Sequence, residues 1–265
     1  MSTPRIRLLL AAVLLCTSVL PAHAMIALAP APTTLMLYDD SLGSLPEAQG
    51  ALTYFDDGFL FGGNAMRSVV PTVGTAYTTD ALVRGGWTST GAGTPLPELD
   101  RQAGFRLDFE LDIVGESHAN GNRAGFSVIL LGADGHGIEL GFWDDAVWAQ
   151  SGPGFTQAES AAFASGAGEI AWGLEVVGDG YTLFADGNAL LGGAVRDYAP
   201  AGFAPYTLAN YLFLGDNTTS AGADIRLGTV SLTAYAPVPL PGALGLLVAG
   251  CGGLAAAARR ARGSA

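Results

Sequence analysis

Apolar and charged residues alternate along the segment FRLDFELDIV at positions 105–114. Its apolar members up to the end of the alternation are Phe105, Leu107, Phe109, Leu111 and Ile113. Side chains of a strand point to opposite faces in turn, so this period predicts a half-buried β-strand. One face of the strand is expected in the core and the other, which carries the charges, in solvent.

Short apolar runs typical of strands recur along the chain. They lie at 124–131, 137–143, 146–150, 171–177, 181–185, 211–215 and 224–235. Asp-Gly pairs at 134–135, 179–180 and 186–187 supply the positive-φ residues of tight hairpins. Only 156–164 predicts a short helix, which excludes a parallel α/β fold. The pattern predicts an all-β chain, folded as an antiparallel two-sheet sandwich of the jelly-roll kind.

The first residues have the composition of an export signal. MSTPRIRLLLAAVLLCTSVLPAHA begins with two arginines, continues with an apolar run and ends with Ala22 and Ala24 as the small residues of a cleavage site. This predicts a signal peptide at 1–24 and a mature chain that starts at Met25.

The last residues, 236–265, combine a proline motif, an uncharged apolar stretch and an arginine cluster. As a helix rising about 1.5 Å per residue, the stretch 243–258 would span roughly 24 Å, short of a hydrocarbon core about 30 Å thick unless it is extended toward the prolines. The arginines are expected to stay in the cytoplasm. The motif and the cluster are Val238, Pro239, Leu240, Pro241, Arg259, Arg260 and Arg262.

Between these ends we expect a single domain at 37–235, after a short N-terminal segment at 25–36. All 24 Asp and Glu residues lie within 25–258, against seven arginines and no lysine. Such an acidic surface repels phosphate backbones, so nucleic acid is not an expected partner. Cys16 and Cys251 both fall outside the domain, which therefore folds without disulfides.

The order of proline motif, glycine-rich apolar stretch and arginine cluster at 237–262 resembles the PEP-CTERM sorting signal of Gram-negative bacteria. Pro239-Leu240-Pro241 matches its V-P-L-P variant in place of the usual Pro-Glu-Pro. The resemblance implies an exosortase, a membrane-embedded cysteine transpeptidase, as a partner. It also implies transient anchoring in the inner membrane through the helix and a final place at the cell surface or in the extracellular matrix. A permanent C-terminal anchor is the alternative.

The stretches RAGFSVILLGADGHGIELGFW, WGLEVVGDGYTLFADGNALL and YLFLGDNTTSAGADIRLGTVSL resemble the concanavalin A-like, laminin-G-like jelly roll. Within that group, RAGFSV, GIELGFW, VWAQ and the early LYDDSLGSLPEAQGALTY are similar to the choice-of-anchor Y domain, a bacterial exported module paired with interchangeable sorting tails. The resemblance covers 37–235. It implies an architecture and carries no established activity.

Carboxylates in ELDIVGE are the candidate catalytic residues. Glu110 and Asp112 share a strand face and Glu116 follows, which is similar to the E-x-D-x-x-E strand of jelly-roll glycosidases except that the second glutamate comes one residue late, after Gly115. A retaining pair stands about 5 Å apart, whereas six residues of regular strand separate the two glutamates by roughly 20 Å. Only a bulge or bend could bring them together. We therefore predict no catalytic residues and no enzymatic activity, with a glycoside hydrolase or lyase using these carboxylates as the alternative.

Calcium is the one cofactor that the sequence suggests. Asp216, Asn217 and Asp224 bracket the loop GDNTTSAGAD and offer the hard oxygen ligands that calcium prefers, and laminin-G-like modules often hold calcium at a rim. The alternative is that these residues simply form turns.

Tryptophans are the candidate ligand contacts. Trp143 or Trp148, next to Asp144 and Asp145, could stack on a sugar ring while the carboxylates accept hydrogen bonds from its hydroxyls. The alternative is that these rings belong to the core. The main prediction is thus a non-catalytic surface module that binds or organises extracellular polysaccharide.

Overall fold

The computed structural model describes residues 31–54, 65–67, 73–78 and 95–237, all within the unit Ala29–Val238. The signal peptide, the sorting motif, the arginine cluster and the stretch 243–258 lie outside the described residues and stay predictions. No helix in the described part of the chain is long and apolar enough to cross a membrane.

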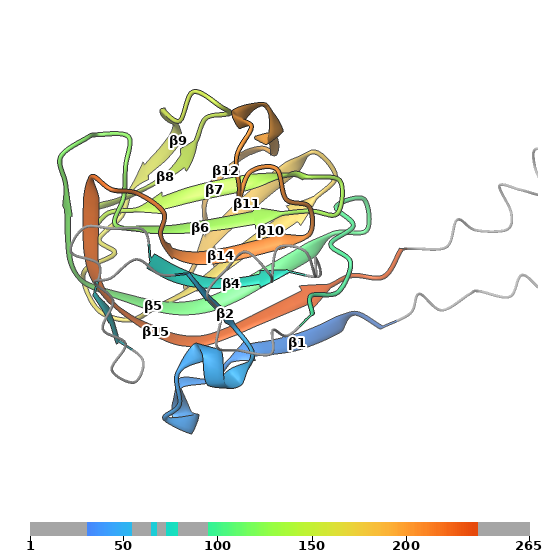
Figure 1. Ribbon diagram of the computed structural model, residues 1–265, viewed down its shortest axis with the longest axis horizontal. Coiled ribbons are helices and arrows are strands. Elements are labelled where there is room, and N and C mark those ends of the chain that lie inside the picture. The colour runs from blue at the N-terminus through green and yellow to red at the C-terminus, as the bar shows by residue number, and fades with distance from the viewer. Residues whose placement is uncertain (1–30, 55–64, 68–72, 79–94, 238–265) are drawn as a thin grey trace, which may run out of the picture. The chain divides into compact units, whose positions relative to one another are not determined.

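Two antiparallel sheets make up the described chain and confirm the predicted all-β sandwich (Figure 1). The β5 sheet runs β1 (Thr33–Tyr38), β15 (Ala221–Ala234), β5 (Phe105–His118), β10 (Ile170–Val177), β11 (Gly180–Ala185), β12 (Asn188–Ala194), with β3 (Ala65–Arg67) on β15. The β7 sheet runs β2 (Leu52–Tyr54), β4 (Val73–Thr78), β14 (Tyr211–Asp216), β6 (Phe126–Leu131), β7 (His136–Phe142), β8 (Ala146–Gln150), β9 (Gln157–Ala162), with β13 (Arg196–Asp197) on β7. Short 3-10 turns occur at η1 (Asp40–Leu42), η2 (Pro46–Gln49) and η3 (Ala199–Ala201).

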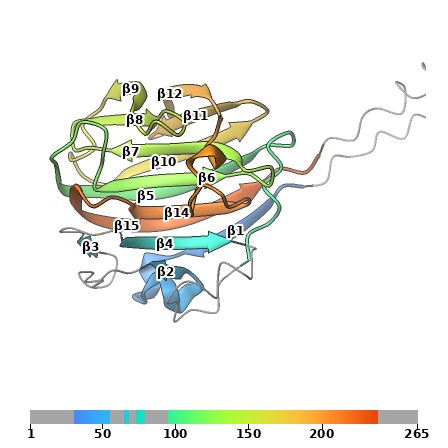
Figure 2. The same ribbon diagram turned by 45° about the horizontal axis from the view of Figure 1, so that its top comes forward.

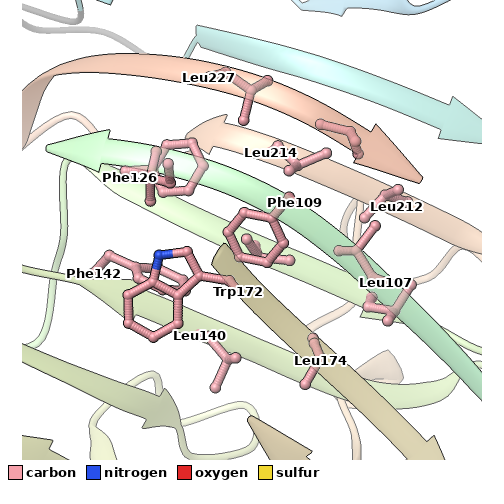
Figure 3. Packing of buried hydrophobic residues seen from close by; sticks show 14 of the residues in the cluster. Leu107, Phe109, Phe126, Leu140, Phe142, Trp172, Leu174, Leu212, Leu214 and Leu227 are labelled. Atoms are coloured by element: carbon pink, nitrogen blue, oxygen red, sulfur yellow. The ribbon is translucent and has the colours of Figure 1, made fainter. Parts of the chain in front are cut away.

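The core lies between the sheets and is built from the alternating apolar positions of facing strands. Leu107 and Phe109 of β5 meet Phe142 of β7 and Leu214 of β14 (Figure 3). The Trp172 ring of β10 lies 5.0 Å from that of Phe142, edge to face, and is 2% exposed. Each such side chain contributes about 1.5–3 kcal/mol through burial. Trp172 is thus a core residue.

The β7 sheet is buried on both faces along β6 and β14, in which every residue is buried. A second apolar cluster lies on the face turned away from the β5 sheet and includes Ile129, Phe213, Tyr198 and Tyr206. The two tyrosines come from residues 198–210, between β13 and β14, which we name the cover segment; its orange turn can be followed in Figure 2. The cover segment hides this face from solvent.

Two local predictions were wrong. Residues 156–164 were expected as a helix, but Gln157–Ala162 forms the edge strand β9, because pairing with β8 satisfies backbone groups of both strands. The turn expected at 179–180 lies one residue earlier, with positive φ at Gly178 (59°) and β11 beginning at Gly180. The Asp186-Gly187 turn is as predicted, with φ of 48° and 78°.

Candidate functional site on the covered face of the β7 sheet

Glu139 is the one acidic residue of β7 and lies in the middle of the strand. Ile138 and Leu140 point into the core between the sheets, so alternation places Glu139 on the covered face. Glycines precede and follow it at two-residue spacing. A Cβ on Gly141 would lie 2.6 Å from the Trp148 ring, so glycine is needed there for the ring to lie over the strand. The glycine thus lets the Trp148 ring pack over the strand beside Glu139.

The carboxyl of Glu139 is held by two side chains from distant parts of the chain. Oε2 accepts a hydrogen bond from the Tyr206 hydroxyl at 2.8 Å, and Oε1 accepts one from Asn217 Nδ2 at 2.8 Å. The Asn217 amide also lies 2.9 Å from the Tyr206 hydroxyl, which closes a triangle. Glu139 is only 4% exposed. The three groups therefore form one buried polar network.

Burial raises the pKa of Glu139, because a carboxylate loses its hydration there. The hydrogen bonds from Asn217 and Tyr206, and the positive charge of Arg123, offset only part of this effect. Burial also raises the pKa of Tyr206, and the nearby Glu139 carboxylate adds to that. The phenol stays protonated at neutral pH, while the carboxyl is shifted toward the range in which it can exchange a proton.

Tyr198 joins β7 to β8 where their backbone pairing ends. Its hydroxyl accepts a hydrogen bond from the Glu139 amide at 3.2 Å and donates one to the Gln150 carbonyl at 2.8 Å. Paired residues of the two strands extend only to Leu140 and Ala149. The tyrosine thus replaces a strand-to-strand bond and fixes the backbone that carries Glu139.

Some buried polar atoms near this network have no hydrogen-bond partner in the described part of the chain. They are Asn217 Oδ1, Gln150 Oε1 and Trp148 Nε1. Gln150 and Trp148 are each 2% exposed and come from β8, the strand beside β7. Unpaired buried acceptors and donors are costly, so they favour a site that takes up a polar molecule.

The structure does not bring Glu110 and Glu116 together. The pairing partner of Glu110 is the exposed Ala171, so its side chain lies on the solvent face of the β5 sheet. A register shift at Val114 then reverses the alternation, and Glu116 pairs with Ala223, which is part of the core. The bulge that the sequence left open is present, but it places the two carboxyl groups on opposite faces of the sheet. They cannot act as a pair.

The first two of these carboxylates have structural partners. Glu110 Oε2 accepts a hydrogen bond at 3.0 Å from the amide of Thr229, at a register shift in β15. Asp112 Oδ2 forms an ion pair with Arg226 at 3.1 Å. Both residues stabilise the solvent face of the β5 sheet.

Glu116 lies in a separate cluster with His118 and Trp143. Its side chain is 2% exposed, and its Oε2 lies 2.9 Å from Nδ1 of His118. The imidazole stacks on the Trp143 ring at 4.0 Å. Burial raises the pKa of Glu116, although the hydrogen bond with His118 opposes it. One face of Trp143 is therefore occupied within the protein.

The predicted sugar contacts at Trp143 and Trp148 are not available as expected. Trp148 is buried, with only 2% exposed, and its ring packs edge-on against Trp143 at 5.8 Å. Asp144 and Asp145 are exposed in the turn between β7 and β8. The carboxylates are accessible to a ligand, whereas the Trp148 ring is not.

The predicted calcium ligands serve other partners. Asp216 is fully buried and its Oδ1 accepts a hydrogen bond from the amide of Thr218 at 2.8 Å. Asn217 binds Glu139, and Asp224 lies within β15. Among the described residues, no group of three or more His, Cys, Asp or Glu side chains could hold a metal ion. The structure does not support the calcium prediction.

An open hollow of about 360 Å³ lies at one end of the sandwich, lined in part by Glu98, Asp100, Arg101 and Asp134. The arginine that lines it, Arg101, already forms ion pairs with both Asp134 and Asp179. The hollow thus offers a ligand mainly carboxylates, and it holds no arrangement comparable to the Glu139 network.

Comparison with known proteins gives matches among solved structures. No protein-family model and no curated protein matches the chain. Alginate lyase A1-II′, of polysaccharide lyase family 7, is 13% identical over 77% of this chain and 95% of that chain, with a TM-score of 0.39. An endo-1,3-beta-glucanase from Streptomyces sioyaensis is 15% identical over 67% and 78%, with a TM-score of 0.34. A carbohydrate esterase of bacteriophage phi24B is 14% identical over 78% and 100%, with a TM-score of 0.48.

The solved structures named here are a lyase, a glucanase and an esterase, and the prediction that the chain is not an enzyme is not carried forward. Identities and TM-scores this low concern the fold, so the reaction rests on the chain's own residues.

Proposed function

We propose that the chain is a carbohydrate-active enzyme, a glycoside hydrolase or lyase, that cleaves a polysaccharide at the covered face of the β7 sheet. The observation that carries this proposal is the Glu139 carboxyl, buried, raised in pKa and hydrogen-bonded by Tyr206 and Asn217. A carboxyl with its pKa moved toward neutrality is the usual means of proton transfer in sugar cleavage. The ELDIVGE carboxylates have no part in this proposal.

Glu139 can transfer a proton in either of two reactions. In hydrolysis, its protonated form would donate to the glycosidic oxygen while water attacks the sugar carbon. In elimination, its ionised form would take the proton next to a uronate carboxylate, a carbon–carbon double bond would form, and the bond to the leaving oxygen would break. That oxygen would then take up a proton, from Glu139 or from water, and depart as an alcohol. Hydrolysis also needs a second carboxylate, about 5 to 9.5 Å from the first. The Glu139 carboxyl itself is compatible with either reaction.

Tyr206 marks where the substrate would bind. In the closed structure its hydroxyl donates to the carboxyl of Glu139 just as a sugar hydroxyl would. Because Glu139 is 4% exposed, the sugar must take the place of the Tyr206 hydroxyl at the carboxyl to reach it. Asn217 follows β14, outside the cover segment, so its amide can stay to bind the sugar.

The test is an assay of the full chain and of Glu139→Gln on a panel of neutral and uronate-containing polysaccharides. Reducing ends report any cleavage, and ultraviolet absorption of the unsaturated product reports elimination alone. We expect product from the wild type and a loss of at least 100-fold in Glu139→Gln, since general acid–base groups contribute about 10² or more. Failure of the wild type to cleave any member, or cleavage that survives in Glu139→Gln, contradicts the proposal.

We also propose that the sandwich is a concanavalin A-like jelly roll of the choice-of-anchor kind, exported and processed by an exosortase. The support is the sequence of the two ends and the two-sheet architecture. Mass spectrometry of the protein recovered from its own cells tests this. We expect an N-terminus at Met25 and loss of the residues beyond the V-P-L-P motif, and an intact C-terminal stretch would show a permanent anchor instead.

A further inference from the structure

Most of the arginines whose side chains the structure describes are paired with carboxylates. Of the five whose side chains the structure describes, four form ion pairs. They are Arg101 with Asp134 and Asp179, Arg106 with Asp108, Arg196 with Glu159, and Arg226 with Asp112. Arg123 is the fifth, and within the described residues it has no carboxylate partner.

Arg123 keeps most of its hydrogen-bonding capacity. Its Nη1 donates to the carbonyls of Asn122 and Phe155, at 2.6 and 2.8 Å. A guanidinium has five N–H donors, so in the described part of the chain Nε and Nη2 remain without a partner. These two atoms form one edge of the guanidinium fork, the edge that binds a carboxylate through two parallel hydrogen bonds.

Aromatic rings connect Arg123 to the Glu139 network. The guanidinium lies over the Phe155 ring at 5.9 Å, and that ring lies 4.8 Å from Tyr206 and 5.9 Å from Phe203. Phe203 is 53% exposed, so part of this aromatic surface faces solvent. The positive charge of Arg123 also acts on Glu139 itself. We name the four residues Arg123, Phe155, Phe203 and Tyr206 the aromatic rim.

The backbone conformation of Phe155 supports a role for this ring in binding. Its φ is +47°, in the left-handed region that large side chains rarely adopt. A hydrogen bond from its amide to the Gly152 carbonyl and the bond that its carbonyl accepts from Arg123 hold it there. Unfavourable backbone conformations of this kind concentrate at binding sites.

We propose that the aromatic rim is a binding subsite for an acidic sugar, a pyranose that carries a carboxylate. The flat rings match the C–H face of the pyranose, and the open edge of Arg123 matches its carboxylate. A neutral sugar would leave the guanidinium unmatched. The subsite adjoins Glu139 through Tyr206, so the inference rests on the proposed function and names its substrate class, a uronate-containing polysaccharide.

Binding can be measured apart from cleavage in the full chain carrying Glu139→Gln. The probes are tetrasaccharides of galacturonate, glucuronate or mannuronate, with a tetrasaccharide of glucose for comparison, titrated by calorimetry. We expect at least one acidic probe to bind at least tenfold more tightly than the glucose probe. When Arg123→Gln is combined with Glu139→Gln, the affinity for the acidic probe should fall at least tenfold and the affinity for the glucose probe should not change. Arg123→Lys should give an intermediate affinity for the acidic probe, because lysine keeps the charge and loses the fork.

Matched controls separate this result from general effects. Arg226→Gln removes an arginine from the solvent face of the other sheet and should change nothing. Phe203→Ala, at an exposed position, should lower the affinity for the same acidic probe several-fold without affecting folding. Equal binding of acidic and glucose probes, absence of binding by every acidic probe, or an unchanged affinity in both Arg123 variants overturns the inference. Binding that depends on Arg123 while the wild type cleaves nothing would sustain the subsite and refute the proposed function.

Discussion

The outer faces of the two sheets each carry a glutamate, but one glutamate is solvated and the other is buried. On the β5 sheet, buried and partly exposed residues alternate along β5, and Glu110 faces solvent, where it receives a single backbone hydrogen bond. On the β7 sheet, Glu139 occupies the equivalent middle position of its strand but lies under the cover segment with three polar neighbours. One glutamate fits a solvated surface, and the other requires a network built around it.

This difference shows which carboxylate is available for chemistry. A solvated carboxylate interacts mainly with water, whereas a buried one has its pKa shifted and its geometry fixed by its partners. The candidate carboxylates in ELDIVGE were noticed because they alternate with apolar residues. A strand with one ordinary solvent-exposed face gives the same alternation. Glu139 was inconspicuous because it is a single polar residue within GIELGFW.

The largest expected effect on stability is at Tyr198. Tyr198→Ala removes a fully buried ring and the bridge between β7 and β8, so we expect a loss of about 3–5 kcal/mol in the free energy of unfolding. Val177→Ala, at a position 51% exposed on β10, should cost less than about 0.5 kcal/mol. Urea denaturation measures both. Similar losses in the two variants would erase the contrast between the covered and the open face.

A smaller effect is expected from the hydroxyl alone. Tyr198→Phe keeps the ring but leaves the Glu139 amide and the Gln150 carbonyl unpaired, at a cost of about 1–3 kcal/mol. The same denaturation assay applies. A cost below about 0.3 kcal/mol would mean that the hydroxyl does not hold the strand that carries Glu139.

The pH dependence of stability tests the burial of Glu139. Because its pKa is raised in the folded state, the folded protein binds more protons than the unfolded chain between the ordinary value of 4.5 and the raised one. Its contribution to stability is therefore complete below pH 4.5 and is lost as the pH rises through the folded pKa. Between these two values the wild type should lose roughly 1.4 kcal/mol of stability relative to Glu139→Gln each time the pH rises by one. A constant difference between the two proteins would show that the carboxyl is solvated.

The smallest effect is expected on the open face. Asp112→Asn breaks the ion pair with Arg226, whose side chain is 57% exposed, and surface pairs of this kind contribute about 0–1 kcal/mol. Thermal unfolding at low and high salt checks this. A loss of several kcal/mol would mean that the open face also carries a tightly coupled polar network.

The strands could be predicted from sequence because their signals are local. The alternation in FRLDFELDIV and the Asp186-Gly187 turn each reflect a single strand or hairpin, and both agree with the structure. The early strands β1 to β4 and the last hairpin strand β12 were not predicted, since their runs are short or rich in small residues. The edge strand β9 was predicted as a helix because Ala and Glu favour helices when pairing with a neighbour is ignored.

The site could not be predicted because its members are distant in sequence. Tyr206 and Asn217 lie 67 and 78 positions from Glu139. The only local signal was the spacing of Gly137, Glu139 and Gly141 on one face of an otherwise apolar strand. The register shift at Val114 falls where the alternation ends, at the adjacent apolar residues Ile113 and Val114, but this local break does not reveal that Glu110 and Glu116 end on opposite faces.

The most direct measurement is the rate of polysaccharide cleavage by Glu139→Gln beside that of Glu110→Gln, on the substrate that the wild type cleaves fastest. The covered-face account predicts a rate at least 100-fold lower for Glu139→Gln and a rate within about twofold of the wild type for Glu110→Gln. The opposite order, with Glu110→Gln inactive and Glu139→Gln active, would contradict the account and return the chemistry to the solvent face of the β5 sheet.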